Sequence, residues 1–149
     1  MQLRSVRTVV IFAVLLATTL LFSGKAEAQF SVNEQVSEAV TLVRIGRSSN
    51  ERTIAAMLLC GITEGDASKQ VDDKSLLSIE ALLDSNDDSV RYWVALCLGH
   101  NFGPRAKGAV RELLKILDQL DCVKRAHTSA PEVRFALKQI TGKDPPLEM

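Results

Sequence analysis

Cysteines and histidines are the residues of this 149-residue sequence that are best suited to chemistry. There are three cysteines, Cys60, Cys97 and Cys122, and two histidines, His100 and His127. Cys122 and His127 lie close enough in sequence to act in principle as a nucleophile and its base, but nothing else in the sequence supports that pair. The cysteine spacings of 37 and 25 residues match no zinc-ligand pattern. We therefore predict no catalytic residue and no metal site.

An acidic run at residues 84–88 places oxygen-bearing side chains at the first, third and fifth positions of a calcium-loop pattern. The sixth position is Ser89 where the loop needs glycine, and the twelfth is Ala95 where it needs a bidentate glutamate. The run therefore predicts a turn that caps a helix. No glycine-rich phosphate loop or serine-nucleophile motif occurs, and we predict no cofactor.

The N-terminus has the pattern of an export signal. Two arginines precede an apolar run at Val9–Phe22, and Ala26-Glu27-Ala28 is a small-x-small cleavage motif. A signal peptide at residues 1–28 is expected to leave a mature chain of residues 29–149. The apolar run is shorter than the ~20 residues that span a bilayer, so an uncleaved anchor is the weaker alternative.

Export predicts a periplasmic or secreted protein, in a compartment where two cysteines can form a disulfide. The whole chain carries 18 basic and 18 acidic residues, so its charge balance gives no reason to expect a nucleic-acid partner. No second apolar run follows residue 28, and no membrane contact is expected after signal cleavage.

The mature chain should be all-α, because its apolar residues recur at helical spacing and no segment alternates as a half-buried strand does. The helices are expected at residues 32–45, 51–60, 74–83, 89–98, 105–117 and 131–140. Side chains that can cap helix starts are Ser49 or Asn50, Asp87 or Asp88, and Ser129. Glycines expected to end helices in left-handed geometry are Gly46, Gly61, Gly99 and Gly142. Prolines suited to first turns are Pro104 and Pro131.

An internal repeat pairs these helices into three hairpins. Residues 52–59 match residues 91–98 at an offset of 39, and an offset of 43 places Val90-Arg91 on Val133-Arg134. Both offsets lie near the ~40–47-residue period of helical-hairpin repeats. The hairpins are expected at about residues 32–60, 74–98 and 105–141.

The residues that carry this repeat resemble the bacterial type of HEAT-like repeat. The resemblance rests on residues 76–83, on Asp87-Asp88-Ser89-Val90-Arg91 and on residues 95–99, and it continues through 103–114 and 131–142. Arg111 stands where the family often has proline, and the turn at 122–129 is longer than usual. The resemblance implies a short α-solenoid of about three hairpins in residues 29–149.

Arg52, Arg91 and Arg134 recur once per repeat at the start of each second helix. By the resemblance they are structural residues that bond to acidic groups in the inter-helix turns. Trp93 is assigned to the buried face of its helix, together with Ile54. By the same register, Met57, Tyr92, Leu96 and Phe135 are the protein-binding residues, because second helices line the concave side of such a stack and exposed aromatic and apolar residues supply binding energy.

The implied stack also ranks the cysteines. Successive second helices run parallel, and Cys60 and Cys97 both lie near the C-terminal ends of theirs. Cys60 with Cys97 is therefore the one possible internal disulfide, and Cys122 is left unpaired.

The leading hypothesis is an exported, non-enzymatic module that binds another protein, of unknown identity, through its second-helix face. One alternative is a periplasmic immunity or inhibitor protein. A less favoured alternative is a tetrapyrrole-handling protein, since bacterial HEAT-like repeats resemble those of phycobilin lyases.

Overall fold

Every regular element in residues 30–122 and 130–145, the parts of the chain that the computed structural model describes, is a helix. The predicted signal peptide at 1–28, Ser129 and residues 123–129 of the long turn lie outside them. The elements are α2 (Val32–Ile45), α3 (Ser49–Ile62), α4 (Ala67–Gln70), α5 (Asp73–Glu80), η2 (Ala81–Asp84), α6 (Asp88–Cys97), η3 (Leu98–Phe102), η4 (Gly103–Ala109), α7 (Val110–Cys122) and α8 (Ala130–Thr141).

Side-chain caps set where the helices begin. Ser31 starts α2 with a capping box, in which its hydroxyl accepts from the Glu34 amide while the Glu34 carboxylate accepts from the Ser31 amide. Ser48, one residue before the predicted pair, caps α3. Asp87 caps α6 by accepting from the Ser89 amide. Each cap satisfies an amide that has no partner within its helix.

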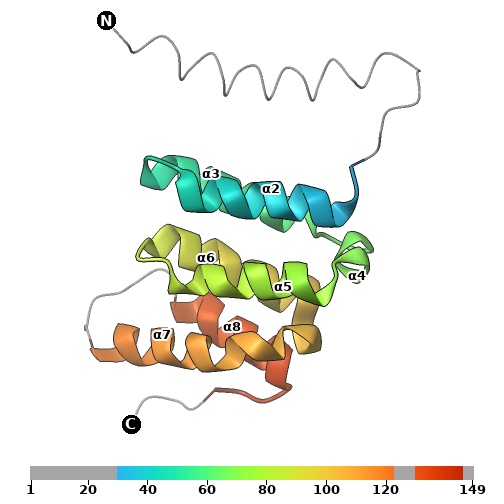
Figure 1. The fold of residues 1–149 in the computed structure, drawn as a ribbon. Coiled ribbons are helices and arrows are strands. Elements are labelled where there is room, and N and C mark those ends of the chain that lie inside the picture. Colours follow the sequence, from blue (N-terminus) through green and yellow to red (C-terminus); the bar gives the residue numbers. More distant parts are fainter. Residues whose placement is uncertain (1–29, 123–129, 146–149) are drawn as a thin grey trace, which may run out of the picture. The chain divides into compact units, whose positions relative to one another are not determined.

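The described helices between Ser31 and Thr141 pack as three successive pairs (Figure 1). In the first pair α2 packs on α3, in the second η2 at the end of α5 packs on α6, and in the third α7 packs on α8. Second helices also contact each other in order, α3 with α6 and α6 with α8, while α2 contacts α5. The core therefore runs continuously from pair to pair.

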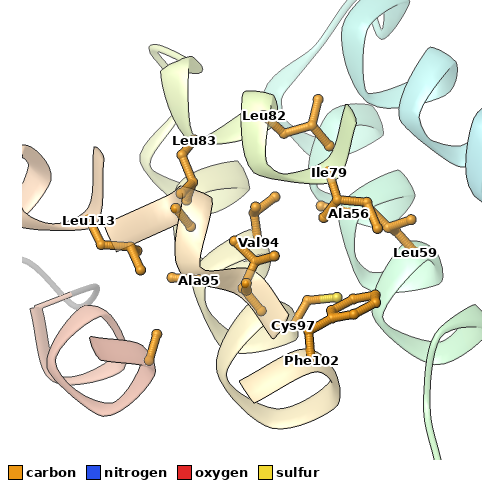
Figure 2. Close-up of a cluster of buried hydrophobic side chains, with 14 of the residues drawn as sticks. Ala56, Leu59, Ile79, Leu82, Leu83, Val94, Ala95, Cys97, Phe102 and Leu113 are labelled. Atoms are coloured by element: carbon orange, nitrogen blue, oxygen red, sulfur yellow. The ribbon is translucent and has the colours of Figure 1, made fainter. Parts of the chain in front are cut away.

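Apolar stripes at helical spacing form that core (Figure 2). On α2 the buried residues are Val36, Ala39, Val40 and Val43, which share one face. Deeper in the stack, the close-up shows residues of three pairs meeting: Ala56, Leu59, Ile79, Leu82, Leu83, Val94, Ala95, Cys97, Phe102 and Leu113. None of the described helices is both long and apolar enough to cross a membrane.

The prediction that Gly99 ends a helix is wrong. The helical path continues through a π-helical turn, η3, and ends at Gly103, whose φ is 49°. Gly99 is buried, and a Cβ added to it would lie 2.9 Å from the Ala136 Cα. Glycine is therefore required at position 99 because η3 and α8 pack closely there, and not because the chain makes a left-handed turn. Gly142, with φ of 72°, does follow α8 in the left-handed region.

Two other elements differ from the predicted helices. The four-residue α4 lies between the helices predicted at 51–60 and 74–83, in a stretch for which no helix was predicted. The helix predicted at 105–117 is divided, since η4 contains a non-helical residue, Ala106 with ψ of 34°, before regular helix starts at Val110. Pro104 is the second residue of η4, in the first turn, where proline is tolerated.

Candidate functional site

Arg52 joins the first pair to the second. Its Nη2 and Nε donate to Asp87 Oδ2 at 2.9 and 3.2 Å, and its Nη1 donates to the Gly46 carbonyl at 3.0 Å. The Asp87 side chain is 8% exposed. Burial opposes ionisation of this carboxyl, but hydrogen bonds from Ser49 and Arg52 outweigh it and lower the Asp87 pKa.

The other two arginines of the series lie in different surroundings. Arg91 donates to Asp88 one turn earlier on its own helix, α6. Arg134 lies half-buried on α8. Arg52 therefore links the first helix pair to the second, whereas the bond from Arg91 to Asp88 stays within α6.

The four residues predicted to bind a protein differ in exposure. Met57 is 44% exposed, whereas Tyr92, Leu96 and Phe135 are half-buried. Tyr92 packs edge-to-face against Trp93, with ring centroids 5.3 Å apart. Phe135 lies against His100, with centroids 4.4 Å apart. The aromatic members thus already contact neighbours within the chain.

A second set of exposed apolar side chains lies on the first pair, and sequence reasoning missed it. Leu42 and Ile45 on α2 are 43% and 66% exposed, and Ile54 and Leu58 on α3 are 48% and 55% exposed. They are spaced three and four residues apart, so each pair shares one face of its helix. Ile54 had been assigned to the buried face, and its exposure shows that assignment to be wrong.

The repeat register explains why Ile54 and Leu58 are exposed. At the offset of 39 they correspond to Trp93 and Cys97, and Ile62 corresponds to Asn101. Cys97 and Asn101 face the preceding pair, where they contact Thr63 and Cys60 on and just beyond α3. On α3, Ile62 packs against the core, whereas Ile54 and Leu58 are exposed, so no further helix pair among the described residues covers them.

The last pair presents a different outer surface. Apart from Pro131, the exposed residues of α8 are polar: Lys138, Gln139 and Thr141. On the other helix of this pair, α7, Leu114 is 39% exposed. Among the described residues, large exposed apolar side chains are therefore more numerous on the first pair than on the last.

Two thiols meet where the first and second pairs pack. Cys97 is fully buried, Cys60 is half-buried, and both are free in this structure. Asn101 Nδ2 lies 3.8 Å from each sulfur, and Thr63 Oγ1 lies 3.3 Å from Cys97 Sγ.

The two thiols differ in acidity. The hydrogen bond with Cys97 is the main cause that lowers the Cys60 pKa, and Asn101 adds to it against the opposing effects of burial and of Glu64. The same bond, together with burial, raises the Cys97 pKa well above its ordinary value. Cys60 is therefore the thiol that more readily becomes a thiolate.

The described residues form no metal-ligand cluster. No group of three or more His, Cys, Asp or Glu side chains in residues 30–119 and 130–145 is placed to hold a metal ion. The hypothetical Cys122–His127 pair lies outside the described side chains.

No protein-family model, no curated protein and no solved structure matches this chain.

Proposed function

We propose that the chain is an exported, non-enzymatic α-solenoid of the HEAT-like type that binds another protein. The repeat pattern and the order in which the helix pairs contact each other support the solenoid. The signal-like N-terminus supports export to the periplasm or the medium.

One observation carries the binding proposal: the first pair exposes Leu42, Ile45, Ile54 and Leu58. We call these four residues the end face. Exposed apolar groups that lie on one face are a feature of protein-binding surfaces. Single exposed apolar residues would need no explanation, but Ile54 and Leu58 correspond in the repeat register to Trp93, which packs against the core, and to Cys97, which is buried.

The predicted strip on the second helices adjoins the end face. Met57 lies on α3 between Ile54 and Leu58 in sequence and is itself exposed. Tyr92, Leu96 and Phe135 extend the strip along α6 and α8. A partner that contacts both surfaces gains apolar area from the end face and aromatic contacts from the half-buried residues.

The chemistry of the partner follows from what surrounds the end face. Glu38 on α2 is exposed one turn before Leu42, and Arg44 and Arg47 are exposed on either side of Ile45 in sequence. We therefore expect a protein partner with an apolar surface whose border carries charges of both signs. The border charges would favour encounter and orientation more than affinity.

Affinity capture from an envelope extract of the source cells tests this function. Bait protein with Ile54→Ser and Leu58→Ser should lose a partner that the unaltered chain retains. The matched control carries Leu77→Ser and Leu114→Ser, which remove exposed apolar groups from other surfaces. If the control loses the same partner, or if the end-face variant keeps it, the proposed surface is wrong.

Export has its own test. The full chain produced in a bacterium should appear in the periplasmic or extracellular fraction with Gln29 as its first residue. A chain that stays in the membrane fraction with Met1 or Gln2 at its start would instead support the uncleaved anchor.

A further inference from the structure

The contact between Cys60 and Cys97 is built by two neighbouring helices. Cys60 lies in the last turn of α3, and Cys97 is the last residue of α6. These two helices pack on one another, and both sulfurs lie 3.8 Å from one atom, Asn101 Nδ2, at the boundary between the first and second pairs. The two thiols are therefore close neighbours across that boundary.

Asn101 holds the surroundings of both sulfurs in place. Its Nδ2 donates to the Cys60 carbonyl and to Thr63 Oγ1, each at 2.9 Å, and the same nitrogen lies 3.8 Å from both sulfurs. An amide nitrogen has two hydrogens, and the two short bonds use them. Its positive end then faces the sulfurs as a fixed dipole, which favours a thiolate there.

The burial of the two sulfurs differs. Cys97 is fully buried, whereas Cys60 is half-buried and can meet a reagent from solvent. The lowered Cys60 pKa and the raised Cys97 pKa agree with this division. Accessible thiolate character is what makes a cysteine react with an external disulfide.

We propose that Cys60 and Cys97 are a redox-active dithiol, in which Cys60 attacks a small-molecule disulfide such as oxidised glutathione and Cys97 then closes an internal disulfide. Asn101 is a positioning residue for this exchange.

The exchange balances in two steps. The Cys60 thiolate attacks one sulfur of glutathione disulfide, the glutathione S–S bond breaks, and one glutathione thiolate leaves with the electron pair. Cys97 then loses its proton to solvent and attacks the Cys60 sulfur, which releases the second glutathione thiolate. The two protons lost by the protein thiols protonate the two released thiolates. One glutathione disulfide is reduced by two electrons, and the Cys60–Cys97 disulfide forms.

The resulting bridge would tie α3 of the first pair to α6 of the second. Because it closes a long loop of chain, it should raise the midpoint of thermal unfolding by about 10 °C. The inference is independent of partner binding. It uses the predicted export only to place the protein where such oxidants occur.

The full chain with Cys122→Ser tests the exchange, because it leaves the two thiols in question. Reduced protein is incubated with oxidised glutathione, quenched in acid, alkylated with N-ethylmaleimide and weighed by mass spectrometry. We expect no alkylated thiol and one crosslinked peptide that joins Cys60 to Cys97. Two free thiols, or a glutathione adduct that persists, would overturn the proposal.

Single-cysteine variants test which thiol acts first. In Cys122→Ser protein that also carries Cys97→Ser, glutathione should remain trapped on Cys60, since no second thiol can displace it. With Cys60→Ser in place of Cys97→Ser, Cys97 should acquire glutathione at least 10-fold more slowly. Equal rates at the two sites would contradict the assigned order.

The role of Asn101 is tested by the pH profile of Cys60 alkylation in the Cys122→Ser protein. Asn101→Leu should move the midpoint of the profile upward and slow bridge formation. His100→Ala is the control, because His100 lies on the same π-helical turn but faces Phe135. An Asn101→Leu midpoint equal to that of the control would remove Asn101 from the proposal.

Discussion

Arg52 on α3 donates two hydrogen bonds to Asp87, the residue that caps α6. The same guanidinium donates to the carbonyl of Gly46, directly after α2. One side chain therefore ties together the end of α2 and the starts of α3 and α6. Since Asp87 is largely buried, this contact differs from the exposed ion pairs that contribute little to stability.

The Asp87→Ala variant should lose about 2 kcal/mol of unfolding free energy. About half of this is the lost helix cap, and the rest is the lost partner of a partly buried guanidinium. Urea denaturation followed by circular dichroism measures the change. Asp84→Ala is the control, since Asp84 is an exposed carboxylate at the end of η2, and it should change the stability by less than about 0.5 kcal/mol. Equal losses of unfolding free energy in the two variants would show that the contact between Arg52 and Asp87 does not stabilise the fold.

The contribution of Asp87 to stability should depend on pH. Its pKa in the folded chain is lowered, so the unfolded chain, with an ordinary value of about 3.9, binds a proton first as the pH falls. The stabilisation is complete above the unfolded value and is lost as the pH falls through the folded one. The stability difference between the unaltered chain and Asp87→Asn should therefore shrink below about pH 4, as urea titrations at pH 6 and pH 3 would show. A difference that is constant with pH would contradict the assigned ion pair.

Gly108 should tolerate alanine less well than Gly61 does. A Cβ at Gly108 would lie 2.3 Å from Glu80 Oε2, whereas a Cβ at Gly61 has nothing within 4 Å. The Gly108 and Ala109 amides act to lower the Glu80 pKa against the larger, opposing effect of burial, and alanine at 108 would displace the carboxylate from them. We expect Gly108→Ala to cost about 1 kcal/mol and Gly61→Ala, within α3, to stabilise by about 0.5 kcal/mol.

The cause of the Gly108 effect can be isolated with Glu80→Ala. In that background the carboxylate is absent, so Gly108→Ala should become neutral or stabilising. Thermal or urea unfolding of the four proteins in this double-mutant cycle gives the coupling. A cost that persists without Glu80 would show that the clash lies elsewhere.

The sequence predicted the helices well where local signals agree. For α2 the apolar spacing predicted Val32–Ile45, which is its observed range. Gly99 was misread because glycine often marks a left-handed turn, whereas here its lack of a Cβ allows contact with Ala136, which is distant in sequence. The interruption of the helix at Ala106 was also missed, because Pro104 is the one nearby residue that indicates a change in helix geometry.

The candidate surface was predicted less well, for a physical reason. The repeat register makes Ile54 equivalent to Trp93, but register alone does not tell which side of a helix has a neighbour. Trp93 packs against the core because α6 has helix pairs on both sides, whereas within residues 30–122 and 130–145 the helix that carries Ile54, α3, has a pair on one side. The pairing of Asn101 with Thr63 could not be predicted either, because it depends on the π-helical turn after α6.

Thr63 and Asn101 should prove energetically coupled. Thr63 is fully buried, and its Oγ1 accepts from Asn101 Nδ2 at 2.9 Å while it donates to the Leu59 carbonyl at 3.0 Å. Thr63→Val preserves the shape of the side chain but leaves the Asn101 amide without that acceptor, so it should cost about 1–3 kcal/mol. Urea denaturation under reducing conditions keeps the nearby thiols from contributing to the measured difference.

Replacing both partners tests whether the hydrogen bond itself causes that loss. The double variant Thr63→Val with Asn101→Leu removes donor and acceptor together, so it should be less destabilised than the sum of the single variants by about 1 kcal/mol or more. Thr63→Ser is the matched control, because serine keeps the hydroxyl that accepts from Asn101. Its own loss of stability comes from the missing methyl group, and this loss should add to that of Asn101→Leu without coupling. Strict additivity of the Thr63→Val and Asn101→Leu losses would mean that the two side chains stabilise the boundary between the first and second pairs independently.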